Sequence, residues 1–169
     1  MNYLSKDLSY SRIVNHILEN EDFLKISNCK HHGITRLEHS LRVSYFSYKI
    51  CKKLHLNAKE TAEAGLLHDF FTNEGMTKRQ NKLSIFIHPK KSLKNASYHF
   101  DLTDMQKDII YSHMFPLIPN RPPKYLESWL VSFVDKVVAV YEFAISYHKK
   151  YFLKLENIAT IMLLVFTKI

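Results

Sequence analysis

Several histidines and aspartates of this 169-residue chain stand where polar side chains are not expected. His68 and Asp69 directly follow the apolar run at 65–67, and Asp135 lies inside the apolar segment 129–139. Burying a carboxylate without a partner is costly, so a cationic group must meet Asp135. That group is either a Lys or Arg side chain or a metal ion.

Three further histidines add to the candidate ligands. His39 falls in the first turns of a predicted helix, and His88 and His113 fall at the boundaries of predicted elements. Imidazole and carboxylate together suit divalent Mn, Fe, Co, Ni, Zn or Mg, whereas a structural zinc site would favour thiolates. If one carboxylate bridges, the set suffices for two ions that clamp a phosphoryl group and activate water. The candidate ligands are His39, His68, Asp69, His88, His113 and Asp135.

Composition narrows the class of protein. Three glycines and five prolines are too few for a β-sandwich or barrel, and no glycine-rich phosphate loop is present. The two cysteines form no CxxC pair, which fits a reducing compartment. The chain starts without a signal peptide, and its longest apolar run, 161–166, is far short of the roughly 20 residues that span a bilayer. We therefore expect a cytoplasmic protein with no membrane association.

The apolar pattern predicts an all-α fold of six or seven helices in one domain, 1–169. Capping boxes at 35–38, 57–60 and 103–106 predict three helix starts. Residues 72–87 are expected to form a loop, with Pro89 as the first residue of the next helix. Prolines at 116–123 predict a non-helical connector. The apolar segment 125–147 predicts a further helix, and 151–166 a separate last one.

In order, the candidate ligands read H…HD…H…H…D, set in EHSLRV at 38–43 and GLLHD at 65–69. Over about residues 33–142 the sequence resembles the HD superfamily of metal-dependent phosphohydrolases. The resemblance implies a helical bundle around a centre of one or two divalent ions. His39, His68, Asp69 and Asp135 would bind the first ion. Asp69 would bridge to a second, completed by His88 and His113.

The resemblance also implies hydrolysis of a nucleotide or another small phosphate ester by metal-activated water, an activity of EC 3.1 or 3.6 type. Asp69 and Arg36 are the predicted catalytic residues. Arg36 precedes His39 by three residues and so shares its helix face, which makes Arg36 a candidate phosphate contact. Arg121, in the Pro-rich connector, is a second candidate for substrate binding.

One departure from the family pattern keeps a second function open. Many catalytic members carry a Lys shortly after the HD pair, whereas here Asp69 is followed by Phe70, Phe71 and Thr72. The alternative is a non-catalytic HD module that binds a nucleotide or a protein partner and uses the metal structurally.

The formal net charge of +8 permits a phosphate-bearing partner, but no nucleic-acid recognition motif accompanies it. We expect a small phosphorylated substrate, most simply a nucleotide, rather than a nucleic acid. The apolar end of the last predicted helix should dock on the domain or on another chain, so a homodimer is a further expectation.

Overall fold

The computed structural model describes residues 3–31, 34–73, 77, 79 and 83–166. Within them the fold is all-α, as predicted, with a single two-stranded ribbon in which Lys30 pairs with Thr35 and His31 with Ile34. Two four-residue helices, α1 and α3, bring the described helices to eight rather than six or seven. The elements are α1 Tyr3–Lys6, α2 Leu8–Leu18, α3 Glu21–Leu24, η1 Lys25–Asn28, β1 Lys30–His31, β2 Ile34–Thr35, α4 Arg36–Lys53, α5 Ala58–Leu67, α7 Ser84–His99, α8 Asp104–Ser112 and α9 Leu126–Phe166.

Side-chain caps set the starts of the three helices that the capping boxes predict. At α4 the Thr35 hydroxyl accepts from the Glu38 N–H at 3.2 Å, and the Glu38 carboxylate accepts from the Thr35 N–H at 2.9 Å. Thr103 caps α8 in the same reciprocal way. At α5 the Asn57 side chain caps the helix, but its backbone N–H donates to Glu127 of α9 instead. Each cap satisfies N–H groups that a helix start leaves without a partner.

Helices α4 and α5 pack closely because the contact between them is made of small residues. A Cβ on Gly65 would lie only 3.1 Å from the Ser44 Cα. The Ser44 hydroxyl accepts from the Tyr10 hydroxyl at 2.8 Å and donates to the Ala62 carbonyl at 2.6 Å, so its polar group is satisfied inside the core. This contact holds the C-terminal end of α5 against the middle of α4.

Helix α7 starts earlier than the sequence predicts. It begins at Ser84, so Pro89 lies inside the helix and is not its first residue. Pro89 has no N–H to donate, so the helix lacks the backbone hydrogen bond that would otherwise run to the Ile85 carbonyl. The predicted loop 72–87 is therefore shorter at its C-terminal end, and residues 74–76, 78 and 80–82 of it lie outside the described residues.

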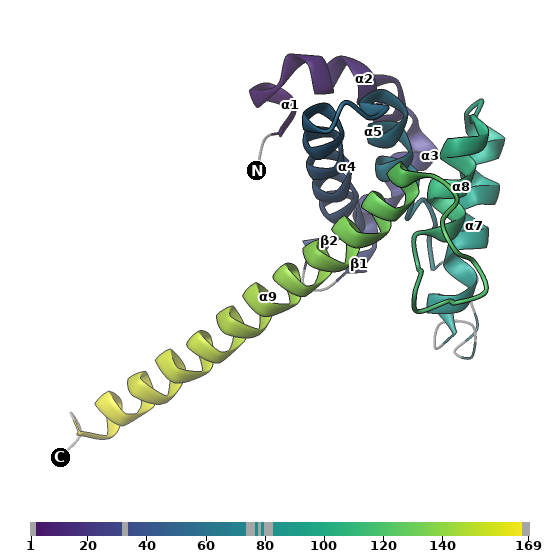
Figure 1. Cartoon of the computed structure of the whole chain (residues 1–169). Helices are drawn as coiled ribbons and strands as arrows, with labels where there is room; N and C mark the ends of the chain where they lie inside the picture. Colours follow the sequence, from purple (N-terminus) through teal and green to yellow (C-terminus); the bar gives the residue numbers. More distant parts are fainter. Residues whose placement is uncertain (1–2, 32–33, 74–76, 78, 80–82, 167–169) are drawn as a thin grey trace.

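The predicted helices 125–147 and 151–166 are one continuous helix, α9, of 41 residues. The residues between them, His148, Lys149 and Lys150, include no Gly, Pro or capping residue, so nothing ends the helix there. At 1.5 Å per residue it is about 60 Å long. Its first half packs on α4, α5 and α8, and its second half extends beyond the helical body (Figure 1). Within the described residues, no helix has an apolar stretch that could cross a bilayer.

We predict that Gly65→Val lowers the free energy of unfolding by about 1–3 kcal/mol, because the added side chain collides with the α4 backbone at Ser44. Denaturant titration followed by circular dichroism measures the change. Lys59→Val, which adds the same side chain on the exposed side of α5, is the matched control and should have a much smaller effect. A Gly65→Val protein as stable as the control would contradict the close α4–α5 contact.

Candidate metal centre

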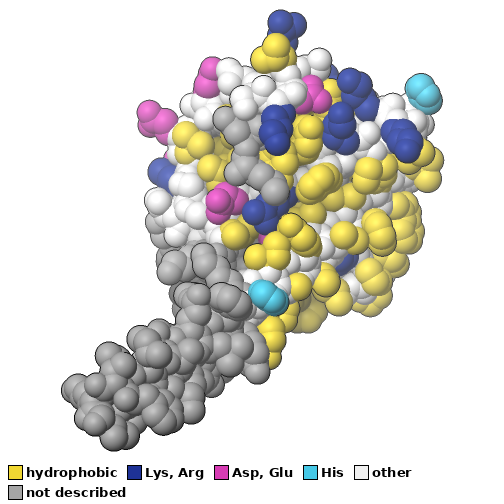
Figure 2. Space-filling view, turned by 90° about the vertical axis from the view of Figure 1, so that its left-hand side faces the viewer, with side chains coloured by type: hydrophobic (Ala, Val, Ile, Leu, Met, Phe, Trp, Pro, Cys, Tyr) yellow, Lys and Arg dark blue, Asp and Glu magenta, His cyan; other side chains and the backbone are white. Residues whose placement is uncertain are grey.

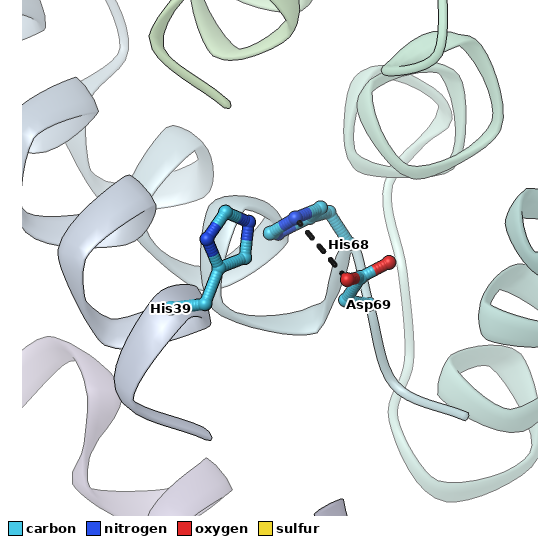
Figure 3. Close-up of side chains that lie close together, drawn as sticks. All are labelled: His39, His68 and Asp69. Atoms are coloured by element: carbon cyan, nitrogen blue, oxygen red, sulfur yellow. Dashed lines mark ion pairs between the residues drawn. The ribbon is translucent and has the colours of Figure 1, made fainter. Parts of the chain in front are cut away.

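The structure brings the six predicted ligands together from five segments of the chain. His39 lies in the first turns of α4, His68 and Asp69 follow α5, and Asp135 lies on the inward face of α9. His88 belongs to α7 and His113 caps the C-terminal end of α8. All six are buried. Figure 3 shows His39 and His68 side by side, with the Asp69 carboxylate beside His68.

The ligand atoms of the cluster lie within a few ångströms of one another. Asp135 Oδ1 is 3.0 Å from His39 Nε2 and 3.6 Å from His68 Nε2. Asp69 Oδ1 is 3.3 Å from His88 Nε2 and 3.9 Å from His113 Nε2. Two ligand atoms that each lie about 2.1 Å from one ion are separated by roughly 3.0–3.4 Å, so this spacing suits shared coordination. Asp69 groups with His39 and His68 and also with His88 and His113, so it joins the two halves of the cluster.

Backbone carbonyls fix the orientation of three of the imidazoles. Nδ1 of His68, His88 and His113 lies 2.7, 2.8 and 2.8 Å from a carbonyl oxygen in its own turn of chain. A carbonyl only accepts, so each Nδ1 carries the proton and, in the neutral ring, each Nε2 presents a bare lone pair. Nδ1–H donation to a fixed acceptor is the usual arrangement of a metal-binding histidine.

The bare lone pairs then face one another and the carboxylates. His88 Nε2 and His113 Nε2 are 2.8 Å apart, a contact that two bare acceptors cannot make: it requires a proton or a metal ion between them. His68 Nε2 and Asp69 Oδ1 are buried and have no hydrogen-bond partner. Unsatisfied acceptors in a buried site are what a divalent cation relieves. The residues therefore fit one or two metal ions.

The electrostatics of the cluster favour ionised carboxylates and neutral His88 and His113. Burial acts to raise the pKa of Asp69, but the surrounding histidines hold it below its ordinary value, and the same opposition lowers the pKa of Asp135. Burial lowers the pKa of His88 and of His113. Ionised carboxylates beside unprotonated imidazoles form the donor set that a divalent ion requires.

Glu142 is a site residue that the sequence analysis missed. It lies seven residues after Asp135, two turns along the same face of α9, and it is 2 % exposed. Its carboxylate accepts from His39 Nδ1 at 2.8 Å and from the Arg42 guanidinium at 3.0 Å. Burial acts to lower the pKa of His39, but hydrogen bonds to Asp135 and Glu142 raise it to about 10. The seven-residue spacing is the one sequence signal that links Glu142 to the site.

Lys136 also belongs to the site, although its position about 100° round the helix from Asp135 argues against it. Its long side chain donates to the His113 carbonyl and lies 3.3 Å from Asp135 Oδ2. Of the two kinds of partner that the sequence leaves open for Asp135, the structure shows the lysine: one carboxylate oxygen faces Lys136, and the other faces the candidate ligands His39 and His68.

The two predicted substrate-binding arginines lie in different places. The Arg36 guanidinium is buried, stacks 3.8 Å from the centre of the Phe71 ring and donates to the Phe71 carbonyl at 2.5 Å. Its Nε is 3.9 Å from Asp69 Oδ2. The Arg121 guanidinium lies over the Tyr111 ring, 4.5 Å from its centre, and Arg121 does not line the cavity at the ligand cluster.

A cavity of about 320 Å³ opens onto the cluster, a size typical of sites for small molecules. Its polar lining includes Asp69, His88, His113 and Asp135 with the cations Arg36 and Lys136. Its apolar lining consists of Phe71, Ile85, Met114, Leu117 and Ala139. The cavity therefore combines cationic and ligand-type side chains with apolar ones.

One family model matches the sequence of this chain. The family model of the HD domain matches residues 36–140, which is well over half of the chain and includes all six ligands. Glu142 lies just beyond the matched segment. Neither a search of curated proteins nor a search of solved structures gave a match.

We predict that Glu142→Gln weakens metal binding about 10- to 100-fold, because a neutral amide holds His39 less strongly in its metal-binding orientation. Isothermal titration of the metal-free protein with Mn²⁺ or Zn²⁺ measures the affinity. Glu127→Gln, the same change near the start of α9, is the control and should leave the affinity unchanged. Equal affinity in all three proteins would show that Glu142 does not position His39.

Proposed function

Because the chain belongs to the HD-domain family, we propose that it is a metal-dependent phosphohydrolase that cleaves a nucleotide or another small phosphate ester. HD domains are generally metal-dependent phosphohydrolases. The observation that carries the proposal is the buried cluster of four histidines and two aspartates, whose unsatisfied acceptors face one another beside a small cavity.

If two ions bind, they would share Asp69. His39, His68, Asp69 and Asp135 would hold one, and Asp69, His88 and His113 the other. When bound, such an ion supplies a nucleophilic water near neutral pH and positive charge for the phosphoryl oxygens. Imidazole and carboxylate accept several divalent ions, so Mn, Fe, Co, Ni, Zn and Mg all remain candidates.

Lys136 is the cation that would contact the substrate phosphate directly. Lys136 lines the cavity beside Asp135 and has its ammonium group at the edge of the cluster. It supplies the positive charge that many family members take from a Lys after the HD pair. Arg36 lies deeper and holds Asp69 and the Phe71 carbonyl, so its charge acts on the site while its guanidinium stays fixed.

The apolar residues that line the cavity favour a substrate with a flat or apolar group next to the phosphate. Phe71, Ile85, Met114 and Leu117 offer area for such a group, and Ser84 is the neutral polar side chain among the residues that line the cavity. A nucleotide or the phosphate ester of an aromatic alcohol meets this requirement. Its ring can contact the apolar lining residues while its phosphate faces Lys136 and the ligand cluster.

The second candidate is a non-catalytic module that binds a nucleotide with a structural metal. The observation that favours it is the absence of the expected Lys after the HD pair, where Phe70, Phe71 and Thr72 stand instead. Under this hypothesis the metal-loaded protein binds a nucleotide tightly and releases no product.

We predict that Asp69→Ala abolishes both metal binding and phosphatase activity, because Asp69 joins the two halves of the cluster. Elemental analysis by mass spectrometry measures bound metal, and hydrolysis of p-nitrophenyl phosphate and a nucleotide panel measures activity. Circular dichroism checks that the variant is folded. Wild-type protein that keeps full activity after chelation and dialysis would refute the metal mechanism, and tight binding without turnover would favour the second candidate.

We predict that Lys136→Gln raises KM about 10- to 100-fold with bound metal unchanged, which corresponds to the roughly 1.5–3 kcal/mol of a charge-assisted hydrogen bond. Steady-state kinetics with the best substrate of the panel measures the change. Lys90→Gln, on the exposed face of α7, is the matched control. An unaltered KM would remove Lys136 from the substrate site.

A further inference from the structure

A stripe of exposed apolar side chains runs along the outer face of α9, away from the metal centre. Phe133 and Val140 are each 69 % exposed, Val137 is 51 % exposed and Tyr147 is 64 % exposed. Figure 2 shows that hydrophobic side chains cover a large part of one face of the molecule. Large apolar areas of this kind on a folded protein mark surfaces that bind a partner.

The stripe has the spacing of a coiled-coil seam. Leu126, Phe133, Val140 and Tyr147 recur every seven residues, and Leu130, Val137 and Ala144 each follow four residues after one of them. In the sequence, the series that contains Val137 continues through 151, 158 and 165. The series that contains Val140 continues through Lys154, its one polar member, and 161. An apolar 4–3 repeat sustained over this length is the pattern of a helix that pairs with another helix.

Helix α4 extends the apolar surface beside the stripe. Phe46, Ile50 and Leu54 of α4 are partly exposed, and two hollows of about 380 and 490 Å³ lie between them and α9. Both hollows are almost entirely apolar, and neither shares a lining residue with the cavity at the metal cluster. The surface is therefore separate from the proposed active site.

We propose that this surface binds a second copy of the chain, with α9 of one copy packed along α9 of the other in a two-fold dimer. A seam along a helix of about 60 Å is covered over its full length only by another long helix, and each copy supplies one with the same repeat. The pairing is self-complementary because the contacts along the seam are apolar on both sides.

The apolar area is sufficient for a stable dimer. The half-exposed side chains of the stripe and of α4 contribute on the order of 100 Å² each, since a fully covered aromatic side chain buries about 150–250 Å². Eight of them amount to roughly 800 Å² per copy, which is the area of a standard protein–protein interface.

Sedimentation velocity of the full-length, metal-loaded protein tests the proposal. The wild type should sediment with twice the 20.0 kDa of one chain. Phe133→Glu combined with Val140→Glu places charges in the seam, and we expect it to raise the dimer dissociation constant at least 100-fold. Both side chains are exposed, so circular dichroism and bound metal should stay unchanged. Tyr98→Glu, at an 84 % exposed aromatic residue on α7, is the control and should leave the dimer intact.

Three outcomes would overturn the dimer proposal. The first is a wild-type protein that remains monomeric at its highest soluble concentration, and the second is a dimer that the double substitution leaves unchanged. The third is a monomer that binds phosphatidylcholine–phosphatidylserine vesicles through Phe133 and Val140, which would assign the stripe to a lipid surface. None of these outcomes depends on phosphatase activity, so the dimer and the proposed function can fail separately.

Discussion

Burying two carboxylates among four imidazoles is the constraint on which this structure depends. Asp69 and Asp135 are more than nine-tenths buried, and without cationic partners their desolvation would oppose folding. Lys136 and Arg36 each meet one carboxylate from one side, but the remaining acceptors face one another. The packing of α4, α5, α7, α8 and α9 brings these acceptors together in one buried cluster, and a divalent cation in the site would satisfy them.

Helix ends do much of the positioning. His68 and His113 each follow the last residue of a helix, and each donates from Nδ1 to the carbonyl three residues earlier, on Gly65 and Ile110. Those carbonyls belong to the last turn, where a helix leaves its acceptors without partners. The same bond thus satisfies the helix end and turns Nε2 of the imidazole toward the cluster. The close contact of Gly65 with Ser44 then holds this helix end beside His39 on α4.

The sequence predicts those features that depend on local chemistry. The caps at Thr35 and Thr103 start helices where predicted, and the polar residues in apolar runs meet in one site. Glu142 escapes prediction because its importance lies in a contact with His39, 103 residues earlier in the chain. Lys136 is not predicted because helix geometry fixes only the direction in which a side chain leaves the helix. The long, flexible lysine side chain can bend away from that direction. The seven-residue spacing from Asp135 is the one local signal for Glu142, and no local pattern records the contact of Lys136.

Helix α9 carries large apolar residues on two opposite faces, one toward the core and one on the outside. Asp135 and Glu142 lie on the face toward the cluster, and the apolar residues between them pack on α4 and α8. The opposite face repeats large apolar residues although nothing in the described part of the chain covers it. A helix that is apolar on all sides is stable in water only when both faces are covered. The ligand-bearing face is covered by this chain's own core. The proposed dimer would cover the outer face, and it would also hold rigid the helix that supplies Asp135 and Glu142.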